Sequence, residues 1–389
     1  ITDPGSKLDA LAKALDFRAK FLSDPNIGGR YSALSYFGLV PAGLIGVDLN
    51  TLLDRAMAMA ETCSADHPTA QNPGAILGAV MGELAQQGRD KITLITSPTL
   101  TSFGDWVEQL IAESTGKEGK GILPVVGEPV GSPGDYGPDR LFAYLQLAGD
   151  ITHDAAVAAL EAAGYPVVRV PLADRYDLGA QYFLWELATA VASVHLEINP
   201  FDQPNVESAK VQARKMVTEY HEKGKLPTLT PALESDGIAV YGDVEADSVG
   251  AALRAFIDQG ESRAYIAVMA YIQPTTETDA ALLELCTHLR AATHFAVTTG
   301  YGPRFLHSTG QLHKGDGGNG LFIQITADAP QDVAIPDKPG ESASAMSFDV
   351  LKLAQALGDR QALIEANRRV IRFHLGSDTV GGLKTLIQA

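Results

Sequence analysis

The chain has 389 residues, 46% of them hydrophobic and 20% charged, and a formal net charge of −17. This is a globular composition, too long for one ordinary core, so we expect two or three domains. The negative charge argues against a nucleic-acid or anionic-membrane partner but leaves room for a small anionic substrate at a locally basic site. Cys63 and Cys286 are typical of reduced thiols, and the longest apolar run, Phe37 to Val47, is too short for a bilayer. We therefore expect a soluble cytoplasmic protein.

Short apolar, β-rich runs alternate with helical segments along the chain. This alternation is typical of βαβ units on a mostly parallel sheet and predicts an α/β fold. The predicted strands are 91–96, 122–126, 140–147, 166–170, 264–271, 295–299 and 321–326. The predicted helices are 7–14, 51–63, 74–87, 103–115, 153–163, 178–195, 204–223, 246–259, 277–291 and 346–369.

Two stretches rich in glycine and proline, 127–138 and 225–236, interrupt this series. Such stretches commonly mark domain boundaries, so we expect three units at about 1–130, 131–228 and 229–389. The sequence opens abruptly and without an initiator methionine. We therefore expect the chain to be part of a longer polypeptide.

The first candidate site is the run Gly28, Gly29, Arg30, Tyr31 and Ser32, which precedes a helical apolar stretch. Paired glycines let backbone N–H groups approach an anion, and a helix N-terminus favours negative charge. The arginine fork could hold a phosphate or a developing oxyanion. By pattern alone, a tight turn with a surface arginine is the favoured explanation, because a lone Gly-Gly-Arg run is weak evidence.

The second candidate is Glu113, at the edge of the apolar stripe of the predicted helix 103–115. Gly116 is well placed to cap this helix, and Lys117 follows it. A partly desolvated carboxylate at a helix end suits a general base. An ordinary carboxylate on the flank of a helix is the alternative.

Two further segments carry polar residues that could act on a substrate. After the rigid turn 199–204, Lys210 falls in the second turn of a predicted helix and could serve as an acid or an anion anchor, although such lysines are usually solvated. The loop after the strand at 295–299 holds Arg304, His307 and His313 among several glycines, where ligand-binding loops of open α/β sheets lie.

Several chemistries lack their sequence signatures. The two loop histidines are not at helical i,i+4 spacing and have no cysteine or carboxylate cluster beside them, so we expect no metal site. No Gly-x-Ser-x-Gly elbow, P-loop or Gly-x-Gly-x-x-Gly run follows a predicted strand. The pattern therefore disfavours hydrolases, NTPases and dinucleotide-binding enzymes.

Together, segments 28–32, 113–117, 127–129 and 199–203 resemble the phosphoglucose isomerase family, in the order in which that family carries them. The residue sequences of 29–41 and 302–315 resemble those of bacterial transaldolase/isomerase fusions within this family. The resemblance implies three-layer α/β/α domains of the SIS (sugar isomerase) type with mainly parallel sheets, and a C-terminal α/β unit. It also implies interconversion of glucose 6-phosphate and fructose 6-phosphate without a cofactor, in a homodimer.

The resemblance assigns roles to particular residues. It implies that Glu113 is the base, that Arg30 stabilises the enediolate and that Lys210 lies near the sugar-ring oxygen, as proton abstraction beside a carbonyl requires. The further substrate-binding candidates are Gly28, Gly29, Ser32, Gly116, Lys117, Arg304 and His313.

The chain also departs from the family pattern. The family's ring-opening histidine is absent from the matching stretch at 137–144, and we expect His307 to take that role. The family's phosphate loop lies upstream of the part that Ile1 matches, and a transaldolase domain is expected only in the longer polypeptide. Two other interpretations remain open: a non-catalytic SIS module that senses a sugar phosphate, and a structural segment that has lost function.

Overall fold

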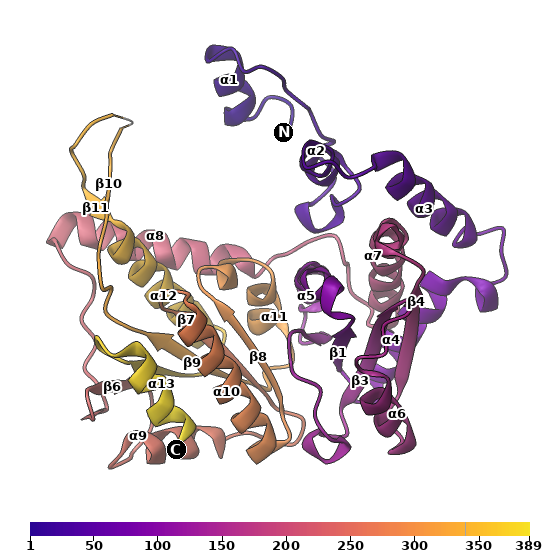
Figure 1. The fold of residues 1–389 in the computed structure, drawn as a ribbon. Coiled ribbons are helices and arrows are strands. Elements are labelled where there is room, and N and C mark those ends of the chain that lie inside the picture. Colours follow the sequence, from indigo (N-terminus) through magenta and orange to yellow (C-terminus); the bar gives the residue numbers. More distant parts are fainter. Residues whose placement is uncertain (339) are drawn as a thin grey trace.

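The computed structural model describes residues 1–338 and 340–389. Two α/β units, each with its own sheet, lie side by side, and an N-terminal helical segment extends from one of them (Figure 1). The chain order places the smaller sheet first and the larger sheet in the C-terminal half.

The N-terminal segment contributes little to either core. It contains α1 (Lys7–Ala14), α2 (Tyr36–Leu44) and α3 (Leu49–Thr62). No residue of α2 is buried, and Leu44 and Ile45 are each 83% exposed. Only α3 packs closely on the first unit, against α7. Between α1 and α2, the short 3-10 turn η1 (Gly29–Tyr31) brings one buried side chain, Arg30, to the body of the protein.

The first unit is a four-stranded parallel sheet in the order β2-β1-β3-β4. Its strands read as continuous apolar runs because helices cover both faces. On one face α4, α5 and α7 pack together around Val107 and Trp185, and on the other face α6 packs on Phe142 and Tyr144. The bounds are β1 Lys91–Thr96, β2 Leu123–Val125, β3 Arg140–Leu147, β4 Val167–Leu172, α4 Pro73–Gln86, α5 Thr101–Thr115, α6 Asp154–Ala162 and α7 Leu178–His195.

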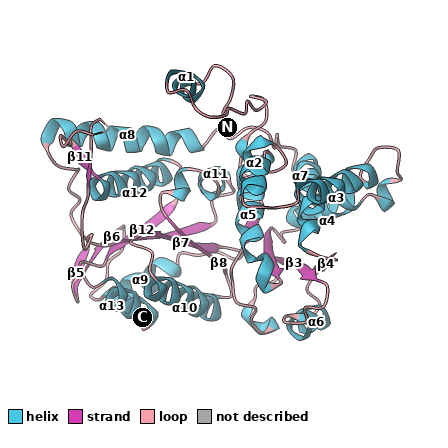
Figure 2. Cartoon of the chain, turned by 45° about the horizontal axis from the view of Figure 1, so that its top comes forward, coloured by secondary structure: helices cyan, strands magenta, loops and turns pink. Residues whose placement is uncertain are grey.

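The second unit is a six-stranded sheet in the order β5-β6-β12-β9-β7-β8. Its four strands β12, β9, β7 and β8 are parallel, and the hairpin β5-β6 adds an antiparallel edge. Figure 2 shows α9, α10 and α13 on one face and α8, α11 and α12 on the other. The bounds of the strands are β5 Leu233–Ser235, β6 Ile238–Tyr241, β7 Tyr265–Tyr271, β8 Ala296–Tyr301, β9 Gly320–Thr326 and β12 Arg369–His374.

The helices of the second unit complete its two outer layers. They are α8 Val206–Lys223, α9 Val249–Ile257, α10 Thr276–Thr293, α11 Thr309–Gly315, α12 Phe348–Glu365 and α13 Thr379–Ile387. A small hairpin of β10 (Ala334–Ile335) and β11 (Met346–Ser347) precedes α12. Among the helices that the structure describes, none combines the length and apolar character that a bilayer crossing requires.

The two units share a continuous apolar core. Leu123 and Val125 of β2 pack in one cluster with Tyr265 and Phe322 from the second sheet. Burying apolar surface between the units stabilises their arrangement, since each Å² removed from water is worth roughly 25 cal/mol. The interface therefore fixes α5 of the first unit against α11 of the second, which are in direct contact.

The structure confirms the predicted α/β fold with mainly parallel sheets, but it corrects the expected units. β1 pairs with β3, so the boundary expected near residue 130 falls inside one sheet. The glycine- and proline-rich stretch at 127–138 is a loop at the edge of that sheet and no linker. Helix α8, expected in the unit 131–228, packs against α12 of the second unit. The helix expected at 346–369 ends at Glu365, and the chain then enters β12.

Candidate active site

Arg30 is the buried centre of the site. Its side chain donates from Nε to Ser114 Oγ at 2.9 Å, from Nη1 to Gln203 Oε1 at 2.9 Å and from Nη2 to the Pro200 carbonyl at 2.7 Å. Trp106 Nε1 holds the Arg30 backbone by donating to its carbonyl at 3.2 Å. A guanidinium that is 3% exposed needs this many acceptors, because an unpaired buried charge is costly.

Glu113 lies against this guanidinium. Its Oε1 is 3.3 Å from Arg30 Nη1, and its Oε2 accepts a hydrogen bond from Gln109 Nε2 at 3.2 Å. The residue is 9% exposed, and it sits in the last turn of α5, whose apolar residues face the core. Glu113 is more enclosed than its predicted position at the edge of an apolar stripe, because the whole last turn of α5 is buried. The arrangement places a largely dry carboxylate beside a fixed cation, which suits proton abstraction next to a carbonyl.

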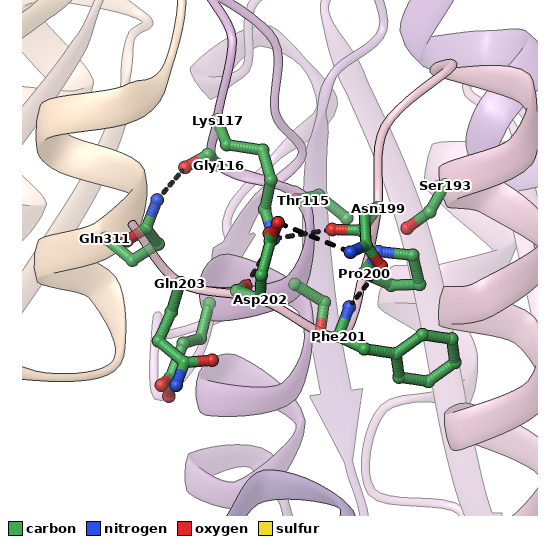
Figure 3. A network of polar contacts seen from close by, with 12 residues as sticks. Thr115, Gly116, Lys117, Ser193, Asn199, Pro200, Phe201, Asp202, Gln203 and Gln311 are labelled. Atoms are coloured by element: carbon green, nitrogen blue, oxygen red, sulfur yellow. Dashed lines mark hydrogen bonds and ion pairs between the residues drawn. The ribbon is translucent and has the colours of Figure 1, made fainter. Parts of the chain in front are cut away.

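Lys117 is held by the segment that follows α7, as Figure 3 shows. Its Nζ donates to the Asn199 carbonyl at 2.7 Å and to Asp202 Oδ1 at 2.8 Å. Burial lowers the pKa of Lys117, although hydrogen bonding to Asp202 works in the opposite direction. Because its donors are occupied by the protein, Lys117 fixes the 199–203 segment, and its contact with substrate stays a prediction.

The glycines and the serine of the predicted site have different surroundings. Gly28 caps the N-terminus of η1 and Gly29 is its first residue, and Ser32 Oγ donates to the Gly29 carbonyl at 2.7 Å, which closes that turn. Gly116 caps α5 as predicted, with its N–H donating to the Ala112 carbonyl at 3.1 Å. A Cβ at Gly116 would lie 2.2 Å from Leu312 Cα of α11. Gly116 therefore faces a helix of the second unit, and its contact with substrate stays a prediction.

Lys210 and His307 are not brought to Arg30 and Glu113 by any contact of the described residues. Lys210 Nζ lies 3.8 Å from Glu207 Oε2, and its side chain is one-third exposed. His307 is exposed at the end of the 3-10 turn η6 (Arg304–Leu306). Their predicted roles as ring-oxygen anchor and ring-opening residue stay predictions.

The other two loop residues have internal partners. Arg304 Nη2 donates to Glu108 Oε1, and this ion pair joins the second unit to α5. Burial raises the pKa of Glu108 to about 7 even though Arg304 lies beside it. His313 is 1% exposed among Phe305, Phe322 and other aromatic rings, and burial lowers its pKa well below the usual range. The protein encloses this ring, and contact of His313 with substrate stays a prediction.

Sequence reasoning missed three residues that complete the site. Gln203 and Gln109 orient Arg30 and Glu113, and the first could have been found because it ends a segment already singled out. Glu186 on α7 carries no such signal. One of its oxygens is buried without a hydrogen-bond partner among the described residues, and burial raises its pKa to about 8.

Among residues 1–338 and 340–389, no group of three or more histidine, cysteine or acidic side chains is arranged to hold a metal ion. The polar groups gathered at Arg30 and Glu113 are instead two glutamines, a serine and backbone carbonyls. Such a set can orient an ion pair and hydrogen-bond a hydroxylated ligand.

Comparison with known proteins finds similar sequences over part of the chain. It is similar to glucose-6-phosphate isomerases. That of Rubrobacter xylanophilus is 32% identical over 230 residues, which are 48% of this chain and 52% of the relative. That of Limosilactobacillus reuteri is 30% identical over 246 residues, or 53% and 54% of the two chains. The chain thus spans about half the length of the curated relatives it matches. No family model matches it.

Solved structures resemble the fold only distantly. A hypothetical protein from Thermus thermophilus aligns with 92% of this chain and 90% of its own, at 14% identity and a TM-score of 0.32. The C-terminal domain of glucosamine-fructose-6-phosphate aminotransferase from Francisella tularensis aligns with 88% of this chain and 94% of its own, at 10% identity and a TM-score of 0.25.

Proposed function

We propose that the protein is an aldose–ketose isomerase that interconverts glucose 6-phosphate and fructose 6-phosphate. The observation that carries the proposal is the pair of Arg30 and Glu113, 3.3 Å apart and largely removed from water. The similarity to glucose-6-phosphate isomerases over about half the chain supports it.

The reaction needs one proton to move between two carbons. In the direction from aldose to ketose, Glu113 takes the proton from C2 of the open-chain sugar, and the electron pair of that bond forms the enediolate. Arg30 stabilises the negative oxygen of this intermediate, because its fork of donors is already oriented by Ser114 and Gln203. Glu113 then returns the proton to C1 while the hydroxyl proton of O2 passes to O1, which leaves C2 as the carbonyl carbon and C1 as the alcohol carbon. The atoms balance without any cofactor.

The finer assignments belong to the same proposal. We propose SIS-type domains, a homodimer, a cytoplasmic location and a transaldolase domain in the longer polypeptide, all supported by the resemblance of segments 29–41 and 302–315 to fusion enzymes. His307 is the proposed ring-opening residue and Lys210 the proposed neighbour of the ring oxygen. Both side chains are at least partly exposed and accessible to a ligand.

The decisive variant is Glu113→Gln, which keeps the shape of the side chain and removes the base. We expect isomerisation of fructose 6-phosphate, followed in an assay coupled to glucose-6-phosphate dehydrogenase, to fall by at least ~1000-fold. Exchange of the C2 proton of glucose 6-phosphate with deuterated solvent, followed by NMR, should fall with it.

The matched control is Glu118→Gln, an exposed glutamate in the turn just after α5. It should retain wild-type turnover. A purified wild-type protein that binds fructose 6-phosphate but neither isomerises it nor exchanges one of its C1 protons with solvent would reject the enzyme in favour of a sugar-phosphate sensor.

A further inference from the structure

Helix α11 of the second unit is inserted against the end of α5. All seven of its residues, Thr309–Gly315, are buried. Two close approaches require glycine at this contact. A Cβ at Gly116 would lie 2.2 Å from Leu312 Cα, and a Cβ at Gly315 would lie 2.3 Å from the Gly116 carbonyl oxygen. The backbone of α11 therefore lies directly on the turn that ends the helix carrying Glu113.

Gln311 is the polar residue of this contact and is fully buried. Its Nε2 donates to the Gly116 carbonyl at 2.8 Å and to Asn205 Oδ1 at 2.7 Å, and its Oε1 accepts from the Asn205 backbone N–H at 2.8 Å. In Figure 3 Gln311 reaches across from α11 to Gly116, with the 199–203 segment in front of the same turn. One amide thus uses both of its hydrogen atoms and its oxygen.

The two partners of Gln311 belong to the two parts of the proposed site. Gly116 is the cap of α5, three residues after Glu113. Asn205 follows Gln203, whose side chain accepts from Arg30. The amide therefore ties the element that carries the base to the segment that orients the cation.

We infer that Gln311 is a positioning residue for the isomerase site, through which the second unit sets the separation of Glu113 and Arg30. This inference rests on the proposed function. A displacement of one ångström between catalytic groups can cost about 100-fold in rate, so a bond that fixes two halves of a site affects turnover more than binding. Without the Gln311 amide, the Gly116 carbonyl and the Asn205 backbone N–H would be buried without a partner. Because an unpaired buried polar group is costly, both segments would shift.

The test is Gln311→Met, which keeps the length and volume of the side chain and removes its hydrogen bonds. We expect kcat for fructose 6-phosphate to fall at least tenfold while KM changes less than threefold. The rate is expressed per active site, counted by titration with a hydroxamate analogue of the enediolate. Gln311→Glu, which loses the donor to Gly116, should also lose at least tenfold in kcat.

The matched control is Gln324→Met. Gln324 is also fully buried and donates to a backbone carbonyl, that of Ala356 at 2.9 Å, but within the second unit and away from α5. It should lower the melting temperature and leave kcat per active site unchanged.

The pair Gln311→Met and Asn205→Ala should be non-additive in kcat, because both changes remove the bond from Gln311 Nε2 to Asn205 Oδ1. Wild-type kcat in Gln311→Met, or equal losses in Gln311→Met and Gln324→Met, would overturn the inference while leaving the isomerase intact. An inactive wild-type protein would instead reject the proposed function itself.

Discussion

Every nitrogen of the Arg30 guanidinium has an acceptor before substrate arrives. Nε donates to Ser114, Nη1 to Gln203, and Nη2 to the carbonyls of Pro200 and Asp202. Such a side chain does not have to reorganise when negative charge develops nearby, and this preorganisation is the main source of electrostatic stabilisation in enzymes.

His307→Ala tests which residue opens the sugar ring. Removing a general acid or base commonly costs 100-fold or more, so we expect kcat/KM for fructose 6-phosphate to fall by about 100-fold. The coupled assay across a pH series measures this loss. His221→Ala, at an exposed histidine near the end of α8, should match the wild type. Equal rates for both variants would remove His307 from the mechanism.

At the scale of elements, the contact of α5 with α11 should be sensitive to a single methyl group. In Gly116→Ala the new Cβ meets Leu312 backbone, which cannot move aside as a flexible side chain would. We expect a loss of about 1–3 kcal/mol in the free energy of unfolding, measured by urea denaturation.

Gly134→Ala is the matched control for this substitution. A Cβ there meets no described atom within 4 Å, so the change should stay within about 0.5 kcal/mol. Equal stability of the two variants would contradict the close contact that the structure shows between α11 and the end of α5.

The strands and helices of the first unit could be predicted because their apolar periodicity is strong. Arg140–Leu147 and Leu178–His195 have the bounds that the pattern indicates. Helix α11 could not be found, because its residues are buried by contacts with α5 and not by an apolar stripe of their own. The predicted elements omit the strand Arg369–His374, and the predicted helix 346–369 extends past Glu365, since Asn367, which adopts a left-handed conformation, is the one local signal for a break.

The site shows the same division between local and long-range information. Glu113 and Arg30 could be proposed from their own segments of the sequence. The structure places Glu113 Oε1 3.3 Å from Arg30 Nη1. The burial of His313 and the surroundings of Gln311 and Glu186 depend on which elements the tertiary fold brings together. No local sequence pattern predicts those contacts.

For the molecule as a whole, Glu186 should make stability depend on pH. Burial raises its folded pKa to about 8 from an ordinary 4.5, so the folded state holds a proton that the unfolded state releases. This favours folding below pH 4.5, and the advantage is lost as pH rises toward 8. Each unit of difference is worth about 1.4 kcal/mol, an upper limit for a side chain that is partly accessible.

Glu186→Gln removes this dependence. Between about pH 5 and pH 8, we expect the wild type to lose a few kcal/mol of unfolding free energy relative to the variant, measured by urea denaturation at each pH. Glu61→Gln, at an exposed position of α3, should follow the wild type across the same range. Parallel curves for Glu186→Gln and the wild type would mean that the carboxyl is well solvated.

The apolar cluster that joins β2 to the second sheet limits how this protein can be taken apart or diversified. A cut in the loop near residue 228 would uncover Leu123 and Val125 on one fragment and Tyr265 and Phe322 on the other. Each fragment would then expose apolar side chains to water and tend to aggregate, so the halves are poor modules for exchange with other proteins. Sequence drift in either half is accordingly constrained by the other.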